Sequence, residues 1–209
     1  YDKDMKNTYG VISYKLFFGL LGFAAVVTEI ATLVERGVFV PANFFSFFTI
    51  ESNIFASLMF IVSAVAVAAG VKSRRLAMFR GAATLYMIVT GIVFAVLLSG
   101  IEGTTLTAVP WDNIVLHYII PLAVVGDWLI DPPHQRIGFK QGLVWLIFPI
   151  AYVAYSLVRG SIVGWYPYPF LNPETNGVVG IIITSLGIAA LGLGLVYVIT
   201  SVTKRRRTS

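Results

Sequence analysis

Residues 177–201 have the sequence GVVGIIITSLGIAALGLGLVYVITS, which contains no charged side chain. At about 1.5 Å per helical residue, a stretch of this length crosses the roughly 30 Å hydrocarbon core of a bilayer. Five more apolar stretches of sufficient length lie at about 12–34, 44–70, 78–99, 113–130 and 141–159. Lipid offers the backbone no hydrogen-bond partners, and these stretches are too long for tilted membrane strands. The sequence therefore predicts an all-α integral membrane protein with a six-transmembrane-helix bundle.

The overall composition supports this prediction. Of the 209 residues, 57% are apolar and only 12% are charged, and the mean hydropathy is +0.84, whereas about a quarter of the residues of a soluble domain are charged. The chain has no cysteine, which excludes disulfides and thiolate chemistry. No internal repeat or long linker divides it, so residues 1–209 are expected to form one domain in the cell membrane. We expect the first span to be a retained helix rather than a signal peptide.

The positive charges predict the orientation in the membrane. Cytoplasmic loops carry an excess of Lys and Arg. With both termini in the cytoplasm, only Arg36 and Arg159 of the 15 cationic residues lie on the outer side. The residues then at or near the inner face are Lys3, Lys6, Lys15, Lys72, Arg74, Arg75, Arg80, Arg136, Lys140, Lys204, Arg205, Arg206 and Arg207. The net charge of +5 is thus explained by topology, and no nucleic-acid partner is expected.

Ionisable side chains inside the spans indicate a functional layer. A charge at such depth costs at least about 2.5 to 3.5 kcal/mol, so these residues are usually placed for use. Four qualify: Glu29, Glu51, His117 and Asp127. Thr49 and His117 lie five and four residues below the outer ends of their spans, roughly 7 Å and 6 Å deep. Glu29 lies at a similar depth in the first span, so we expect these three residues in one layer.

Neighbouring residues suggest how this layer is arranged. Polar residues recur at helical spacing along the second span, at Ser46, Thr49, Asn53 and Ser57, so Thr49 should face other helices rather than lipid. Pro121 lacks the amide that would bond the His117 carbonyl, which predicts a kink and room for a ligand. Structural interpretations remain open: a membrane threonine commonly bonds the carbonyl one turn earlier, and a polar stripe also serves as interhelical contact.

Three sequence features resemble one known family. They are Phe47-Phe48-Thr49-Ile50-Glu51-Ser52-Asn53, His117 in the fourth span, and the outer loop Trp165-Tyr166-Pro167-Tyr168-Pro169-Phe170-Leu171-Asn172-Pro173. Together they look like bacterial relatives of the androgen-induced and androgen-dependent TFPI-regulating membrane proteins. That family consists of multi-pass threonine hydrolases that cleave fatty acid esters of hydroxy fatty acids. The resemblance covers the whole six-span plan and implies Thr49 as nucleophile and His117 as its partner.

This resemblance implies a membrane lipid or fatty acyl ester as substrate, cleaved without cofactor or metal. As general base, His117 would take the Thr49 hydroxyl proton, which places the two groups about 3 to 5 Å apart. Glu29 or Glu51 is a candidate to orient the imidazole, and Asn53 to donate to the oxyanion. Two interpretations of Arg159 are open: binding a substrate carboxylate, or anchoring at the interface beside Glu35 or Glu174.

Two other function classes are compatible with the same residues. In a proton-coupled transporter or flippase, Glu29, Glu51, His117 and Asp127 would form a relay across the bilayer. A lipid-binding scaffold would use the same cavity without turnover. For Asp127 we favour a structural ion pair with Arg80 or Lys15, and below Asn53 we expect a dry apolar layer that separates the two ends.

Overall fold

The computed structural model describes the backbone of residues 2–100 and 107–205 and the side chains of residues 8–100 and 107–203. Over this part of the chain every regular element is a helix. The helices are α1 (Asp2–Glu35), α2 (Pro41–Phe44), α3 (Phe48–Ala68), α4 (Arg74–Val93), η1 (Phe94–Leu98), α5 (Pro110–Ile114), η2 (Val115–Ile119), α6 (Ile120–Ile130), α7 (Phe139–Gly142), η3 (Leu143–Leu146), α8 (Ile147–Val163), η4 (Pro169–Leu171) and α9 (Pro173–Arg205). The side chains of Lys3, Lys6, Lys204 and Arg205, and the whole of Arg206 and Arg207, lie outside the described residues.

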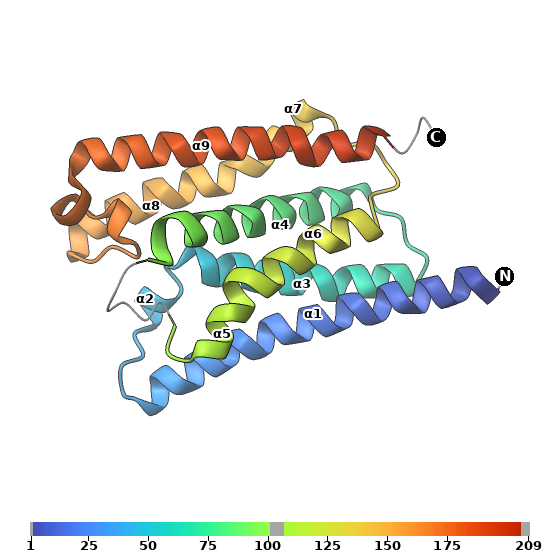
Figure 1. Ribbon diagram of the computed structural model, residues 1–209, viewed down its shortest axis with the longest axis horizontal. Coiled ribbons are helices and arrows are strands. Elements are labelled where there is room, and N and C mark those ends of the chain that lie inside the picture. The colour runs from blue at the N-terminus through green and yellow to red at the C-terminus, as the bar shows by residue number, and fades with distance from the viewer. Residues whose placement is uncertain (1, 101–106, 206–209) are drawn as a thin grey trace.

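Six helical segments are long and apolar enough to span a membrane, as the sequence predicted. They are Thr8–Glu35, Phe48–Ala68, Arg74–Leu98, Pro110–Ile130, Phe139–Val163 and Pro173–Thr203. Helix α1 begins and α9 ends at the same end of the bundle (Figure 1), as an even number of spans requires. We call the opposite end, with Glu35, Phe48 and the loop 164–172, the distal end. That the end with both termini faces the cytoplasm stays a prediction.

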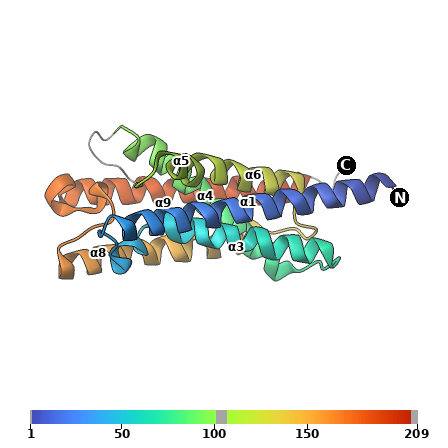
Figure 2. The ribbon, with the colours of Figure 1, turned by 90° about the horizontal axis from the view of Figure 1, so that it is seen from below.

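Helix α4 lies at the centre of the bundle. It packs against α3, α6 and α9, and its membrane segment is the most buried of the six. Helix α1 packs against both α3 and α6 (Figure 2), whereas α9 leaves most of its residues exposed at the edge of the bundle. Such exposed apolar residues suit contact with lipid rather than water.

The second span differs from its prediction at the distal end. We expected one continuous helix from about residue 44, but α2 ends at Phe44 and α3 begins only at Phe48. Phe47 has an extended backbone, with φ −81° and ψ 124°. Pro41 opens α2 at a position where a missing amide costs nothing. The break places Thr49 at the start of a helix rather than within one.

An apolar cluster separates the distal end from the other end of α1, α3, α4 and α6. Its fully buried members include Ala25, Phe60, Met87, Leu116 and Ile120. These residues lie between the layer of Asn53 and the layer of Asp127 along their helices. Whether this layer is dry, as the sequence suggested, stays a prediction.

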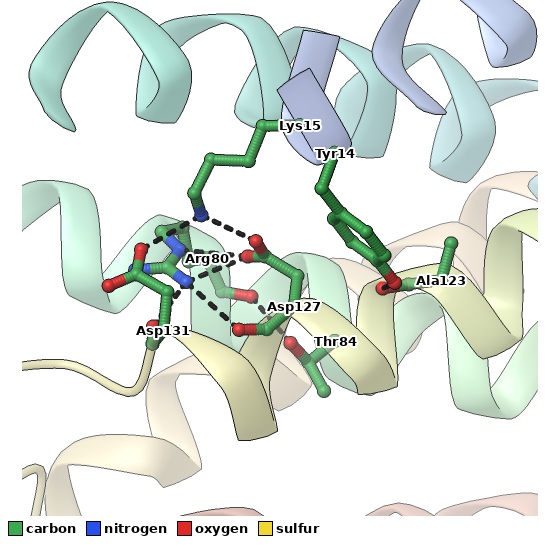
Figure 3. A network of polar contacts seen from close by, with 7 residues as sticks. All are labelled: Tyr14, Lys15, Arg80, Thr84, Ala123, Asp127 and Asp131. Atoms are coloured by element: carbon green, nitrogen blue, oxygen red, sulfur yellow. Dashed lines mark hydrogen bonds and ion pairs between the residues drawn. The ribbon is translucent and has the colours of Figure 1, made fainter. Parts of the chain in front are cut away.

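At the end with the termini, a buried ion network joins α1, α4 and α6 (Figure 3). Lys15 contacts the Asp127 carboxylate and lies 2.9 Å from Asp131 Oδ2. Arg80 Nη2 lies 2.7 Å from Asp127 Oδ2, and Arg80 Nη1 lies 3.2 Å from Asp131 Oδ2. Two cations and two carboxylates therefore balance, and the predicted ion pair of Asp127 is confirmed with both candidate partners.

Replacing Asp127 by Asn should destabilise the protein strongly. Lys15, which is fully buried, and Arg80 would then share the single carboxylate of Asp131. Removing one partner of a buried pair costs about 3 to 5 kcal/mol because it leaves an uncompensated charge. We expect a large drop in the thermal unfolding midpoint in detergent micelles. The control is Lys72→Met, in the turn before α4; an equal effect of both variants would contradict a central role of the network.

Candidate functional site

A cavity of about 350 Å³ opens at the distal end. Its wall contains Thr49 of α3, His117 of η2 and Tyr168 of the loop after α8. The rest of the lining is Glu29, Leu33, Arg36, Val38, Val40, Asn43, Phe44, Phe47, Ile50, Leu98, Thr107, Ala108 and Leu116. Polar groups thus converge on a largely apolar hollow, which is the usual character of a small-molecule site.

The Thr49 hydroxyl makes no hydrogen bond to the backbone of its own helix. Thr84 and Thr200 donate to carbonyls four residues earlier, at 2.9 and 2.8 Å, as membrane threonines commonly do. Thr49 is the second residue of α3, so no helical turn precedes it. Its Oγ1 lies instead 3.2 Å from the Tyr168 hydroxyl oxygen. The helix break therefore leaves a hydroxyl at the cavity wall.

Two tyrosines complete the start of α3. The amide of Thr49 donates to the Tyr168 hydroxyl at 3.2 Å, and the amide of Phe48 donates to the Tyr152 hydroxyl at 3.3 Å. Tyr152 in turn donates to the carbonyl of Ser46 at 2.8 Å. Amides in the first turn of a helix have no partner within it, so the phenols replace the missing carbonyls.

Tyr168 is a site residue to which the sequence analysis gave no role. It lay within the aromatic and proline-rich loop that carried the family resemblance, but nothing in the loop indicated which tyrosine turns inward. Gly164 ends α8 with φ 69°, a left-handed conformation that suits glycine. Burial raises the pKa of the Tyr168 phenol above its usual value, so the group stays a neutral hydrogen-bond donor.

His117 lies in a π-helical turn that adjoins Pro121. The predicted distortion is thus present as one wide turn, a form frequent at functional sites. His117 Nδ1 lies 3.1 Å from the carbonyl oxygen of Asn113. A carbonyl only accepts, so Nδ1 carries a proton, and in a neutral ring the lone pair is then on Nε2. The ring stacks on Phe94 at 3.9 Å between centroids, which fixes its plane.

The structure brings Thr49 and His117 to the same cavity. The partner of the Thr49 hydroxyl is Tyr168, and that of the imidazole is the Asn113 carbonyl. Among the described residues, no hydrogen bond joins Thr49 to His117 directly. A substrate or a water in the cavity would have to complete the contact, which is common in sites without ligand.

Glu29 accepts a hydrogen bond from a backbone amide in the cavity wall. Both of its carboxylate oxygens lie 2.8 Å from the amide of Ala108, and Arg36 Nη2 donates to the Ala108 carbonyl at 2.9 Å. Glu29 of α1 and Arg36, directly after α1, thus bind one residue of the segment before α5. Asp112, which the sequence analysis missed, is fully buried and lies beside Glu29. Its position directly before Asn113, at the distal end of the fourth span, was the available signal.

The remaining candidate residues have other partners. Asn53 donates to the carbonyls of Thr49 and Leu116 at 2.8 and 3.1 Å, so both amide protons are engaged and an oxyanion role is not favoured. Glu51 is half-buried and does not line the cavity. Arg159 donates to Asn43 Oδ1 at 2.7 Å and lies over the Trp165 ring. Within the described part of the chain it forms no salt bridge with Glu35 or Glu174.

Comparison of the chain with known protein families, curated proteins and solved structures finds no match. The chemistry must therefore be argued from the groups at the cavity. They are the Thr49 hydroxyl, which is not bonded within its own helix, the His117 imidazole and the Tyr168 phenol. A hydroxyl and an imidazole that line one cavity are groups that nucleophilic catalysis uses.

We predict that Glu29→Ala will loosen the segment of Ala108. The Ala108 amide would lose its carboxylate acceptor, a bond worth about 1.5 to 3 kcal/mol. Amide hydrogen exchange at Ala108 should then rise about tenfold or more. Glu35→Ala, one helical turn and a half further along α1, should leave this exchange unchanged. Equal exchange in the Glu29 variant and the unmodified protein would show that the bond between the Ala108 amide and the Glu29 carboxylate does not stabilise this segment.

Proposed function

We propose that this protein is an intramembrane threonine hydrolase that cleaves lipid esters, with Thr49 as nucleophile and His117 as general base. The observation that carries the proposal is that the Thr49 hydroxyl escapes bonding within its helix and faces a cavity that His117 also lines. The resemblance of the segments around Thr49, His117 and the loop 165–173 to membrane threonine hydrolases supports the same assignment.

The reaction proceeds in two steps. His117 Nε2 takes the Thr49 proton while Oγ1 attacks the ester carbonyl, and the imidazole then protonates the departing alcohol. The acyl group is left on Thr49. Water next attacks the acyl-threonine with His117 again as base, and the fatty acid leaves. The Asn113 carbonyl keeps the imidazole in the required tautomer, the role that a carboxylate has in hydrolytic triads.

The cavity suits an ester with apolar chains. Its volume of about 350 Å³ lies at the low end of the 300 to 1,000 Å³ common for small-molecule sites. Apolar side chains such as Leu33, Phe44 and Leu98 line it, and the distal end lies near the surface of the bilayer. A lipid carbonyl can then reach Thr49 while its remaining chain stays in hydrocarbon.

Purified protein should hydrolyse long-chain esters, and a fluorophosphonate should label Thr49 as its Oγ1 displaces fluoride from phosphorus. Thr49→Ala and His117→Ala should each lower turnover by on the order of 10³-fold or more, because nucleophile and base act as one unit. Thr49→Ser should keep measurable activity, since it retains the hydroxyl.

Thr84→Ala is the matched control, because Thr84 is also a buried membrane threonine but bonds only its own helix. It should keep full activity. Undiminished turnover in Thr49→Ala would refute the nucleophile. An inert protein that still binds the ester would instead indicate a lipid-binding scaffold.

A proton relay is the main rival, and we expect it to be absent. Asp127 is held between Lys15 and Arg80, and the apolar cluster separates it from the cavity. Protein in liposomes should therefore show no proton uptake driven by a pH gradient. Uptake that Glu51→Gln or Glu29→Gln abolishes would assign the protein to the transporters.

A further inference from the structure

The Tyr168 hydroxyl contacts two atoms of the proposed nucleophile at once. Its oxygen lies 3.2 Å from both the amide nitrogen and Oγ1 of Thr49. Tyr152, which accepts from the amide of Phe48, donates its own proton to a backbone carbonyl, that of Ser46, whereas the second contact of Tyr168 is with the side-chain oxygen of the proposed nucleophile. The mechanism above removes the Thr49 proton but provides no group that stabilises the charge growing on Oγ1.

We propose that Tyr168 is a catalytic residue that donates a hydrogen bond to Thr49 Oγ1 and stabilises its negative charge during attack on the ester. This inference rests on the proposed hydrolase function and assigns a third group to the same site.

Only one of the two hydrogen bonds has a direction fixed by its donor. The Thr49 amide can only donate, so the Tyr168 oxygen accepts there. Either hydroxyl of the second pair can donate, and the proposal assigns the phenol proton of Tyr168 to Oγ1. When Tyr168 donates to Oγ1, the proton of Thr49 itself must point elsewhere, toward the cavity that His117 lines. The accepted amide bond polarises the phenol and strengthens its donation.

The phenol is fixed before any substrate binds. Tyr168 is only 6% exposed, its ring stacks on Phe170 at 5.0 Å between centroids, and it meets Phe47 edge to face at 5.6 Å. Burial raises the pKa of the phenol, so its proton is retained at neutral pH. A donor fixed beside an oxygen that loses its proton stabilises the charge that develops there without reorganising during the reaction.

The step balances without a further reactant. As the bond from Oγ1 to the carbonyl carbon forms, the Thr49 proton moves to His117 Nε2 and the carbonyl π electrons move to the carbonyl oxygen. When the intermediate collapses, the bond to the alcohol oxygen breaks and that oxygen takes the proton from His117. Tyr168 keeps its own proton throughout.

The test is Tyr168→Phe in the full chain, measured by ester turnover and by fluorophosphonate labelling of Thr49. Loss of one such donor lowers kcat by about 10² to 10³-fold, and we expect this loss with little change in KM. Tyr152→Phe is the matched control, because it also removes a phenol from an amide at the start of α3 but touches no atom of Thr49. It should keep turnover within a few-fold of the unmodified protein.

Trifluorotyrosine at position 168 provides a second measurement if the Phe variant fails to fold. It keeps the ring and the hydroxyl but ionises at lower pH, so the loss of activity at alkaline pH should move to lower pH than with tyrosine. If the phenol had only a structural role, the loss of activity at alkaline pH would occur at the same pH as with tyrosine.

Each outcome decides between defined alternatives. Full activity of Tyr168→Phe, while Thr49→Ala is inactive, would overturn the role of Tyr168 and leave the hydrolase standing. Equal loss of activity in Tyr168→Phe and Tyr152→Phe would show that Tyr168 only stabilises the start of the helix. An alkaline loss of activity that stays at the same pH with trifluorotyrosine would show the same. An unmodified protein that neither turns over esters nor reacts with the fluorophosphonate would overturn both proposals.

Discussion

Lipid supplies no hydrogen-bond partner to a backbone amide, and this constraint shapes the distal end of the protein. The break between α2 and α3 opens the first turn of α3 inside the bundle, where its amides need acceptors. The hydroxyls of Tyr152 and Tyr168 provide two of them. The loop after α8 is therefore bound to α3, and the cavity owes its wall to that attachment. A continuous second helix would have needed neither tyrosine.

Apolar length predicted the spans well because it reports directly on the membrane. Charge predicted the partners of Asp127 for a similar reason, since a buried carboxylate must be neutralised and Lys15 and Arg80 were the cations at its depth. The break before Phe48 was missed because the residues there are as apolar as a helix interior. Glu29 was placed in the correct layer, but its partner Ala108 belongs to a segment without a sequence signal.

The contacts between residues of the site could not be predicted from the sequence, for a different reason. Thr49 and Tyr168 are 119 residues apart, and a periodic pattern describes one helix at a time. The imidazole of His117 was expected beside a carboxylate, yet a backbone carbonyl in its own helix orients it. Backbone carbonyls are present at every position, so no pattern of side chains reveals which of them is used.

A threonine in a membrane helix has no hydroxyl proton available for other contacts while it bonds the carbonyl of the preceding turn, as Thr84 does. At the second position of a helix that bond does not exist, and the two branches on Cβ restrict the side chain to few rotamers. The hydroxyl of Thr49 is then held in one direction by its own stereochemistry and by Tyr168. The N-terminus of α3 adds a positive partial charge at this end of the helix. The same break that required new acceptors for the backbone thereby leaves the Thr49 hydroxyl unbonded within its own helix, which is the condition that the proposed attack requires.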